Sequence, residues 1–174
     1  MLGYFGPAGT FTHQALLTLG DEEATPFDTV AAALDAVRDG TVRASVVPIE
    51  NSVEGGVSAT LDNLASADGL MIIREILLPV QFGLYVRPGT SLADIRKVLT
   101  HTHAAAQCRD WLRANLPQAV VTEGGSTAAA AAEVSDPASR YDAAVCAKVA
   151  GEMYGLEPAA YGIADNEGAV TRFV

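Results

Sequence analysis

The 174-residue chain has the composition of a folded domain, since 49% of its residues are hydrophobic and 18% are charged, whereas disordered chains are less apolar and more charged. Its formal net charge of -10 argues against binding to nucleic acid or to an anionic membrane surface, because both need a positive field. Apolar runs fall well short of the roughly 18 residues of a membrane span, and the start at Met1 does not resemble a secretory signal. With only Cys108 and Cys146, we expect a cytoplasmic protein without a disulfide framework.

Runs rich in Val, Ile, Tyr and Phe alternate with stretches of helical periodicity, which predicts an α/β fold with largely parallel strands. Strands are predicted at 2–5, 24–27, 44–49, 70–78, 80–87, 96–100, 119–122, 142–146, 160–163 and 170–174. Helices are predicted at 10–19, 28–38, 57–66, 103–115, 126–134 and 147–154. Asp28 is expected to cap the second helix, which Asp39 and Gly40 should end.

The chain is predicted to form two lobes. Residues 77–80 join two strand-like runs across Pro79, which cannot donate to a central ladder. A return crossing is expected near 154–158, so that residues 1–78 plus 158–174 form one lobe and residues 79–157 the other. Two crossings would leave a cleft between the lobes, a common place for a small-molecule site.

Three segments rich in glycine and hydroxyl groups, 6–12, 50–56 and 123–127, each stand between a predicted strand and a predicted helix. Such junctions expose unpaired backbone N–H groups, and nearby hydroxyls add donors, so they suit carboxylates or phosphates. The alternative for Thr10, Ser126 and Thr127 is helix capping.

Other chemistries have little support in the sequence. The spacing of Gly6 and Gly9 does not complete a dinucleotide motif, and no phosphate-binding loop of the G-x-x-x-x-G-K-[ST] type occurs, so NAD and ATP are not expected. His101 and His103 stand two apart without a full ligand set, and we expect solvated or capping histidines rather than a metal site. Neither cysteine has a pattern typical of a nucleophile.

Several motifs together resemble the prephenate dehydratase family, in order and spacing, across almost the whole chain. They are GYFGPAGTFT at 3–12, VVPIENS at 46–52, TLD at 60–62, AQC at 106–108 with WL at 111–112, GSTAA at 125–129, YGL at 154–156 and TRF at 171–173. The resemblance implies two α/β lobes with a central cleft, like type II periplasmic binding proteins. It also implies decarboxylating dehydration of prephenate to phenylpyruvate, a step in phenylalanine biosynthesis, with no cofactor and no metal.

By this resemblance Thr171 is the catalytic residue, a hydrogen-bond donor or proton relay to the departing hydroxyl of the substrate. A free threonine is a weak acid, so polar neighbours must support proton delivery; the matching positions are Glu50, Asn51, Thr100 and Gln107. Arg172 is expected to bind a substrate carboxylate, with a salt bridge inside the lobe as its alternative. Further substrate contacts are predicted at Thr10, Thr12, Ser52, Ser126 and Thr127.

Two departures from the family pattern affect these expectations. The chain has Thr100-His101-Thr102-His103 where the family commonly has S-H-P-Q, so one wall of the site is less securely matched. It also ends at Val174, where the family usually continues into a regulatory ACT domain. We expect a trimmed part of a longer protein, a homodimer or higher homo-oligomer, regulated by phenylalanine only if that domain is present.

Three other functions share the expected fold. An arogenate dehydratase would bind an amino acid side chain in place of the pyruvyl group. A non-aromatising prephenate decarboxylase needs no acid, so Thr171 counts against it. A small-anion binding protein without catalysis is disfavoured by the T-R-F motif, and turnover of a candidate ligand would eliminate it.

Overall fold

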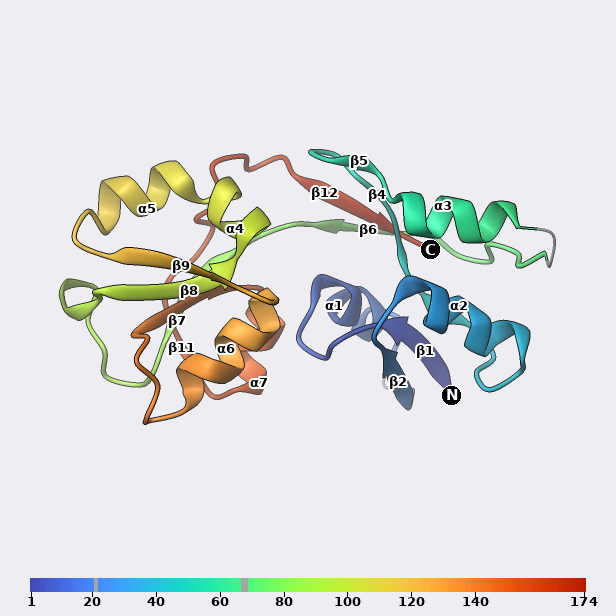
Figure 1. Ribbon diagram of the computed structural model, residues 1–174, viewed down its shortest axis with the longest axis horizontal. Helices are drawn as coiled ribbons and strands as arrows, with labels where there is room; N and C mark the ends of the chain where they lie inside the picture. Colours follow the sequence, from blue (N-terminus) through green and yellow to red (C-terminus); the bar gives the residue numbers. More distant parts are fainter. Residues whose placement is uncertain (21, 67–68) are drawn as a thin grey trace. The chain divides into compact units, whose positions relative to one another are not determined.

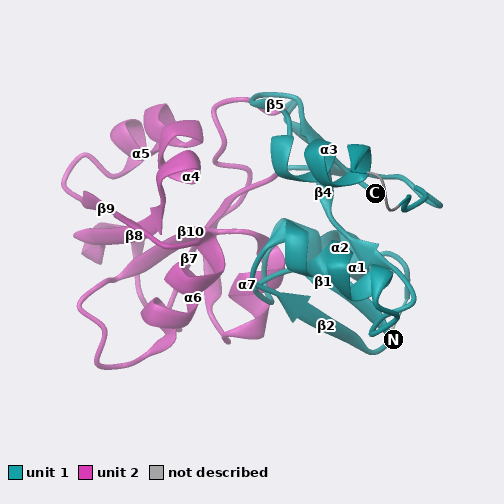
Figure 2. Ribbon diagram, turned by 45° about the vertical axis from the view of Figure 1, so that its right-hand side comes forward, with its two compact units in different colours: residues 1–80, 168–174 teal, residues 81–167 magenta. Residues whose placement is uncertain are grey.

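The computed structural model describes residues 1–20, 22–66 and 69–174 and has a mixed α/β fold (Figure 1). The chain divides into two compact units, each described below by itself (Figure 2). Unit 1 comprises residues 1–80 and 168–174, and unit 2 comprises residues 81–167. No helix of the described residues is long and apolar enough to cross a membrane.

A parallel three-stranded sheet begins unit 1. Strand β1 (Leu2–Phe5) lies between β2 (Ala24–Phe27) and β3 (Ser45–Val46). Helices α1 (Phe11–Leu17) and α2 (Val30–Arg38) connect these strands. Parallel neighbours require such crossover connections, which explains the early β–α–β–α–β order of the chain.

A second, antiparallel sheet completes unit 1. It contains β4 (Pro48–Asn51), β5 (Gly55–Gly56), β6 (Ile76–Pro79) and β12 (Val170–Phe173), in the order β5-β4-β12-β6. Helix α3 (Ser58–Ala65) follows the β4–β5 hairpin. The last strand of the chain therefore lies inside the sheet, hydrogen-bonded on both sides.

One hydrophobic cluster joins the two sheets of unit 1. Phe173 of β12 is 1% exposed and packs with Leu78 of β6. The cluster also contains buried residues of the first sheet and of α1, namely Leu2, Tyr4, Ala15, Leu16 and Val46. One face of the antiparallel sheet is thus buried, and this face determines which side chains of β12 point inward.

Unit 2 is built on a mixed five-stranded sheet. Its strands are β7 (Gly83–Val86), β8 (Lys97–His101), β9 (Val120–Gly124), β10 (Ala143–Cys146) and β11 (Glu157–Ala160), in the order β11-β7-β10-β8-β9. The pairs β10–β8 and β8–β9 are parallel, whereas β7 pairs antiparallel with β10 and with β11.

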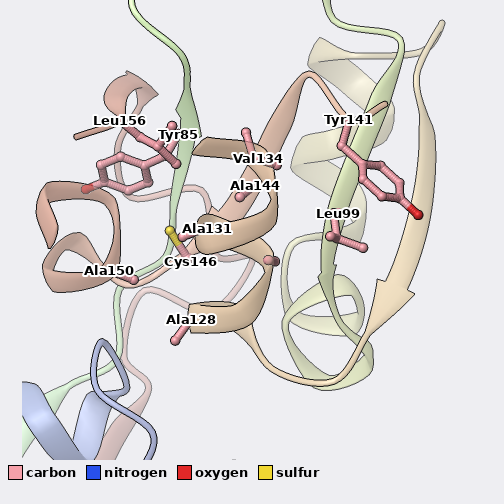
Figure 3. Packing of buried hydrophobic residues seen from close by; sticks show 11 residues of the cluster. Tyr85, Leu99, Ala128, Ala131, Val134, Tyr141, Ala144, Cys146, Ala150 and Leu156 are labelled. Carbon is pink, nitrogen blue, oxygen red and sulfur yellow. The ribbon is translucent and has the colours of Figure 1, made fainter. Parts of the chain in front are cut away.

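Five short helical segments accompany this sheet: η1 (Leu92–Asp94), α4 (Thr102–Gln107), α5 (Arg109–Asn115), α6 (Thr127–Ser135) and α7 (Lys148–Met153). Helix α6 buries its alanine-rich face in the main cluster of this unit (Figure 3). The labelled members of the cluster are Tyr85, Leu99, Ala128, Ala131, Val134, Tyr141, Ala144, Cys146, Ala150 and Leu156.

The expected return crossing near 154–158 is wrong. Residues 157–160 pair with β7 as β11, so they belong to unit 2, and unit 1 resumes only at Gly168. The strand predicted at 160–163 is also misplaced, because Gly162 has a φ of 59°, a left-handed conformation that ends an extended segment. The outgoing crossing lies after Val80, two residues later than expected.

Four other expectations differ from the structure. The predicted strand 70–78 forms a ladder only from Ile76 onward, and the second sheet is antiparallel rather than parallel. The helix predicted at 103–115 is interrupted at Cys108, whose backbone leaves the helical region. Thr29 rather than Asp28 caps α2, since its hydroxyl accepts a hydrogen bond from the Ala32 N–H at 3.0 Å.

The packing of α7 against β7 leads to a stability prediction. A Cβ atom on Gly151 would overlap the ring of Tyr85, which is 2% exposed and cannot move aside. We expect Gly151→Ala to lower the free energy of unfolding by about 1–3 kcal/mol, the usual cost of overpacking a core. Gly125→Ala is the matched control, because its Cβ would meet nothing within 4 Å. Equal urea midpoints for the two variants would contradict this account of the packing.

Candidate functional site

Strand β12 separates its side chains onto two faces of the antiparallel sheet. Successive residues of a strand point to opposite sides. Thr171 and Phe173 are 7% and 1% exposed, whereas Arg172 between them is exposed. The neighbouring strand repeats the pattern, since Leu78 opposite Thr171 is buried and Leu77 opposite Arg172 is exposed.

On the buried face, Thr171 meets Asn51, the residue opposite it on β4. The Asn51 side-chain Nδ2 donates a hydrogen bond of 2.9 Å to Thr171 Oγ1, although the two residues are 120 positions apart. Asn51 Oδ1 accepts from the backbone N–H groups of Val53 at 2.8 Å and Glu54 at 3.3 Å. These two donors identify Oδ1 as the acceptor end of the amide, so Nδ2 must point to Thr171.

The Asn51 contact leaves the Thr171 hydroxyl hydrogen available. A threonine hydroxyl can accept and donate at the same time. Among the described residues, the bond from Asn51 is the side-chain hydrogen bond that Thr171 makes. Accepting from Asn51 polarises the hydroxyl, which strengthens it as a donor to a further group.

On the exposed face, Arg172 pairs with two carboxylates, one on β4 and one just before β6. Its Nε lies 2.8 Å from Glu75 Oε1 and 3.6 Å from Glu50 Oε2. Glu50 is directly opposite Arg172 in the ladder, and all three side chains are about half exposed. The structure therefore puts Glu50 and Arg172 together, on the face opposite Thr171.

Hydroxyl groups of the first two predicted loops make hydrogen bonds within unit 1. Ser52 Oγ accepts from the Val170 N–H at 2.9 Å, which extends the pairing of β4 and β12. Thr10 caps α1, accepting from the His13 N–H at 3.3 Å and donating to Pro7 O at 2.9 Å. Thr12 is 5% exposed on α1.

In unit 2, the predicted residues gather where β8 and β9 end and the next helices begin. The two strands are parallel, with Thr100 opposite Glu123. Helix α4 begins directly after β8, and Ser126 caps α6 just after β9, accepting from the Ala129 N–H at 3.0 Å. Thr127 is the first residue of α6. The carboxyl ends of parallel strands are where α/β sheets bind ligands.

Thr100 and Gln107 differ in what they can offer. Thr100 is fully buried, and its hydroxyl donates to Val145 O at 2.7 Å, so this group ties β8 to β10. Gln107 is the last residue of α4 and is half-buried. Its backbone oxygen accepts from the Asp165 N–H at 2.7 Å, while its side chain makes no hydrogen bond with the described residues.

The surroundings of the two cysteines and of His101 indicate structural rather than catalytic roles. Burial raises the pKa of the Cys108 thiol to about 12, with a smaller contribution from the charge of Asp165. Burial likewise raises the pKa of the Cys146 thiol to about 12. A thiol at such a pKa is almost entirely protonated near neutral pH and is a poor nucleophile. His101 caps α4, as its Nδ1 accepts from the His103 N–H at 3.3 Å, which confirms the capping interpretation for this residue.

The family model described as prephenate dehydratase matches residues 2–174. The chain belongs to the prephenate dehydratase family. A prephenate dehydratase of Amycolatopsis methanolica is 49% identical over 175 residues, which is 99% of this chain and 56% of that protein. The crystal structure of the Arthrobacter aurescens prephenate dehydratase in complex with L-Phe is 48% identical, with a TM-score of 0.90 over 99% of this chain and 57% of the other.

A further solved structure is similar but carries a different description. It is described as a novel type of quorum quenching acylase, is 30% identical, and aligns with a TM-score of 0.85 over 99% of this chain and 62% of the other. The present chain thus spans less than two thirds of the length of the relatives it matches.

The predicted site residues of this member of the prephenate dehydratase family fall into three groups, according to the hydrogen bonds and ion pairs that they make. Asn51 and Thr171 are brought into direct contact. Gln107, Thr12 and Thr127 have side chains that make no hydrogen bond with the described residues. The remaining predicted residues are engaged in caps, sheet contacts or an ion pair: Thr10, Glu50, Ser52, Thr100, Ser126 and Arg172.

Two contributing residues, Glu75 and Asp165, were missed by sequence reasoning. Glu75 makes the shorter ion pair to Arg172. The Asp165 carboxylate accepts hydrogen bonds from the backbone of α5, 54 and 55 positions away. No local pattern signals either role, because each partner is remote in sequence and belongs to a different element.

Unit 2 also contains a groove beside α5. It has a volume of about 440 Å³ and runs between α4, α5 and β9. Its lining includes Arg109, Leu112 and Val121 but none of the predicted site residues.

Proposed function

We propose that the chain catalyses the decarboxylating dehydration of prephenate to phenylpyruvate. The observation that carries this proposal is the Asn51–Thr171 hydrogen bond of 2.9 Å in a chain that belongs to the prephenate dehydratase family. It supplies what the reaction needs, a hydroxyl donor held in one orientation on a rigid strand.

The chemistry requires proton delivery to one oxygen. The C–O bond to the ring hydroxyl breaks, that oxygen takes up a proton, and the group leaves as water. The electrons of the bond to the ring carboxylate move into the ring, so that carbon dioxide is released and the ring becomes aromatic. Prephenate and one proton thus give phenylpyruvate, water and carbon dioxide. Aromatisation supplies the driving force, and the protein must position the substrate and assist the leaving hydroxyl.

Thr171 is proposed as the donor to the leaving hydroxyl, and Asn51 as the group that orients it. A threonine alone is too weak an acid to transfer its proton fully, so its role is a strong hydrogen bond or a relay from a proton source. The Asn51 contact supports this role, because it occupies an acceptor site of the Thr171 oxygen and leaves the hydrogen directed elsewhere.

Gln107 and Thr127 are proposed as polar contacts to the substrate, with Thr12 as a further candidate. Their side chains make no hydrogen bonds with the described residues, which supports a role toward a ligand. Thr10, Ser52, Ser126 and Thr100 are proposed to act through the caps and sheet contacts that shape the loops.

Family membership and the state of the cysteines bear on the assembly and cellular location of the protein. We propose a cytoplasmic homo-oligomer, supported by family membership and by two buried, free cysteines. The Arthrobacter aurescens relative is described in complex with L-Phe. We therefore propose phenylalanine as a regulator of the whole protein if a regulatory domain is present in it.

The direct test is turnover of prephenate by the chain and by Thr171→Ala, followed by the ultraviolet absorbance of phenylpyruvate in alkali. Loss of the donor should lower kcat by about 10²–10⁴-fold, the usual contribution of general acid catalysis. Thr171→Ser should keep most of the rate because it keeps the hydroxyl. Thr60→Ala is the matched control in the same unit: Thr60 is fully buried and donates to Pro48 O at 2.5 Å, so its loss should cost stability without changing kcat.

The same assay separates the alternatives. A folded parent that turns over arogenate but not prephenate would reassign the substrate. Stoichiometric binding of prephenate without product would indicate a binding protein. Full activity of Thr171→Ala would refute the proposed role of the hydroxyl.

A second test concerns Arg172. We propose that it stabilises the sheet through Glu75 rather than binding a substrate carboxylate, because the two groups are 2.8 Å apart on the face opposite Thr171. Arg172→Gln should therefore leave the KM for prephenate within about threefold. Glu75→Gln should also leave this KM within about threefold. Both variants should lose little stability, since exposed ion pairs contribute little. A rise in KM of about tenfold or more, the cost of a lost charged hydrogen bond, seen only in Arg172→Gln, would restore the carboxylate role.

A further inference from the structure

The break between α4 and α5 is a weak point of unit 2. Helix α4 ends at Gln107 and α5 begins at Arg109, so Cys108 is both the C-cap of α4 and the N-cap of α5. The Cys108 side chain makes no capping hydrogen bond and is fully buried. The first backbone N–H groups of α5 therefore need partners from elsewhere.

Asp165 supplies these partners from a distant segment. Its Oδ2 accepts from the Asp110 N–H at 3.0 Å, and its Oδ1 accepts from the Trp111 N–H at 3.1 Å. Its own backbone N–H donates to Gln107 O at 2.7 Å. One residue thus binds the start of α5 and the end of α4 at once.

The negative charge of Asp165 is favourable at the start of a helix. A carboxylate that accepts backbone N–H groups at the start of a helix makes charge-assisted hydrogen bonds and interacts favourably with the helix dipole. The charge of Asp165 also acts on the neighbouring Cys108, raising the pKa of its thiol in addition to the larger effect of burial.

Asp165 also lies just before the point where the chain passes from unit 2 to unit 1. It belongs to the segment that leaves unit 2 and continues into β12, where Thr171 follows six residues later. Ile163, two residues before it, is fully buried and donates its N–H to Phe82 O at 3.0 Å. Both contacts hold this segment to the rest of unit 2, and the Asp165 contact lies at the α4–α5 break.

We propose that Asp165 is a positioning residue, which fixes Gln107 by clamping the α4–α5 break. The role rests on the proposed function, in which Gln107 contacts the substrate. Asp165 acts only through the helix ends. Without the Asp165 carboxylate, the start of α5 loses two hydrogen bonds. The Asp165 backbone N–H, which holds Gln107 O, is then no longer anchored to α5.

The test uses Asp165→Asn and Asp165→Ala. Asparagine keeps the shape and one acceptor but turns an N–H donor toward the backbone N–H groups, while alanine removes both acceptors. We expect kcat for prephenate to fall about 10- to 100-fold in Asp165→Ala, the scale of a small misplacement of a contacting group, and to a lesser extent in Asp165→Asn. Trp111 is the single tryptophan of the chain, so its fluorescence emission should shift in both variants and report the loss of the clamp independently of activity.

Asp142→Ala is the matched control. Asp142 is also in unit 2, and its Oδ2 accepts from the backbone N–H groups of Arg96 and Lys97, both at 2.9 Å. Its substitution removes a comparable pair of bonds, at the start of β8. We expect a similar loss in urea midpoint but unchanged kcat and unchanged Trp111 emission.

The outcomes are distinguishable. If the Asp165 variants keep the parent kcat and lose only as much stability as Asp142→Ala, the residue is merely structural and the positioning proposal is overturned. Should Asp165→Ala fail to fold, the graded loss in Asp165→Asn still decides the question. A parent without prephenate turnover would instead overturn the proposed function, and the catalytic part of this proposal with it.

Discussion

The pairing of β12 between β4 and β6 is the constraint on which the candidate site depends. This strand is the last of the chain, yet it fills an interior position of its sheet and is hydrogen-bonded on both sides. Phe173 fixes its register by inserting into the core of unit 1, because a shift by one residue would move every side chain to the other face. The same register sets Thr171 against Asn51.

Strand alternation then divides the T-R-F motif between two environments. Thr171 and Phe173 share the buried face, whereas Arg172 projects to the exposed face beside Glu50 and Glu75. Adjacent residues of one motif need not serve one ligand. Fold alone is a similarly poor guide, since a structure 30% identical to this chain, with a TM-score of 0.85, is described as an acylase. Assignment of the activity therefore rests on particular residues.

Local patterns predicted much of the fold, because helix caps and short strands are encoded by neighbouring residues. The strands at 2–5 and 24–27 agree with β1 and β2, and Thr10 and Ser126 cap helices as one interpretation of their loops expected. The motif match also predicted that Asn51 and Thr171 serve one site, and the structure brings them into contact. Local patterns could not predict long-range contacts. The ion pair of Glu75, the hydrogen bonds of Asp165 and the bond from Thr100 to Val145 each form through tertiary packing. The break at Cys108 was hidden because helical periodicity continues through it.

The central claim is that Asn51 acts through Thr171, and a double-mutant cycle tests it most directly. Turnover of prephenate would be measured for Asn51→Ala, Thr171→Ala and the variant carrying both. If Asn51 serves to orient the Thr171 hydroxyl, its removal should cost nothing further once the hydroxyl is gone, so the double variant should be no slower than Thr171→Ala. A double variant slowed by the product of the two single effects would show that the residues act independently and would contradict the account.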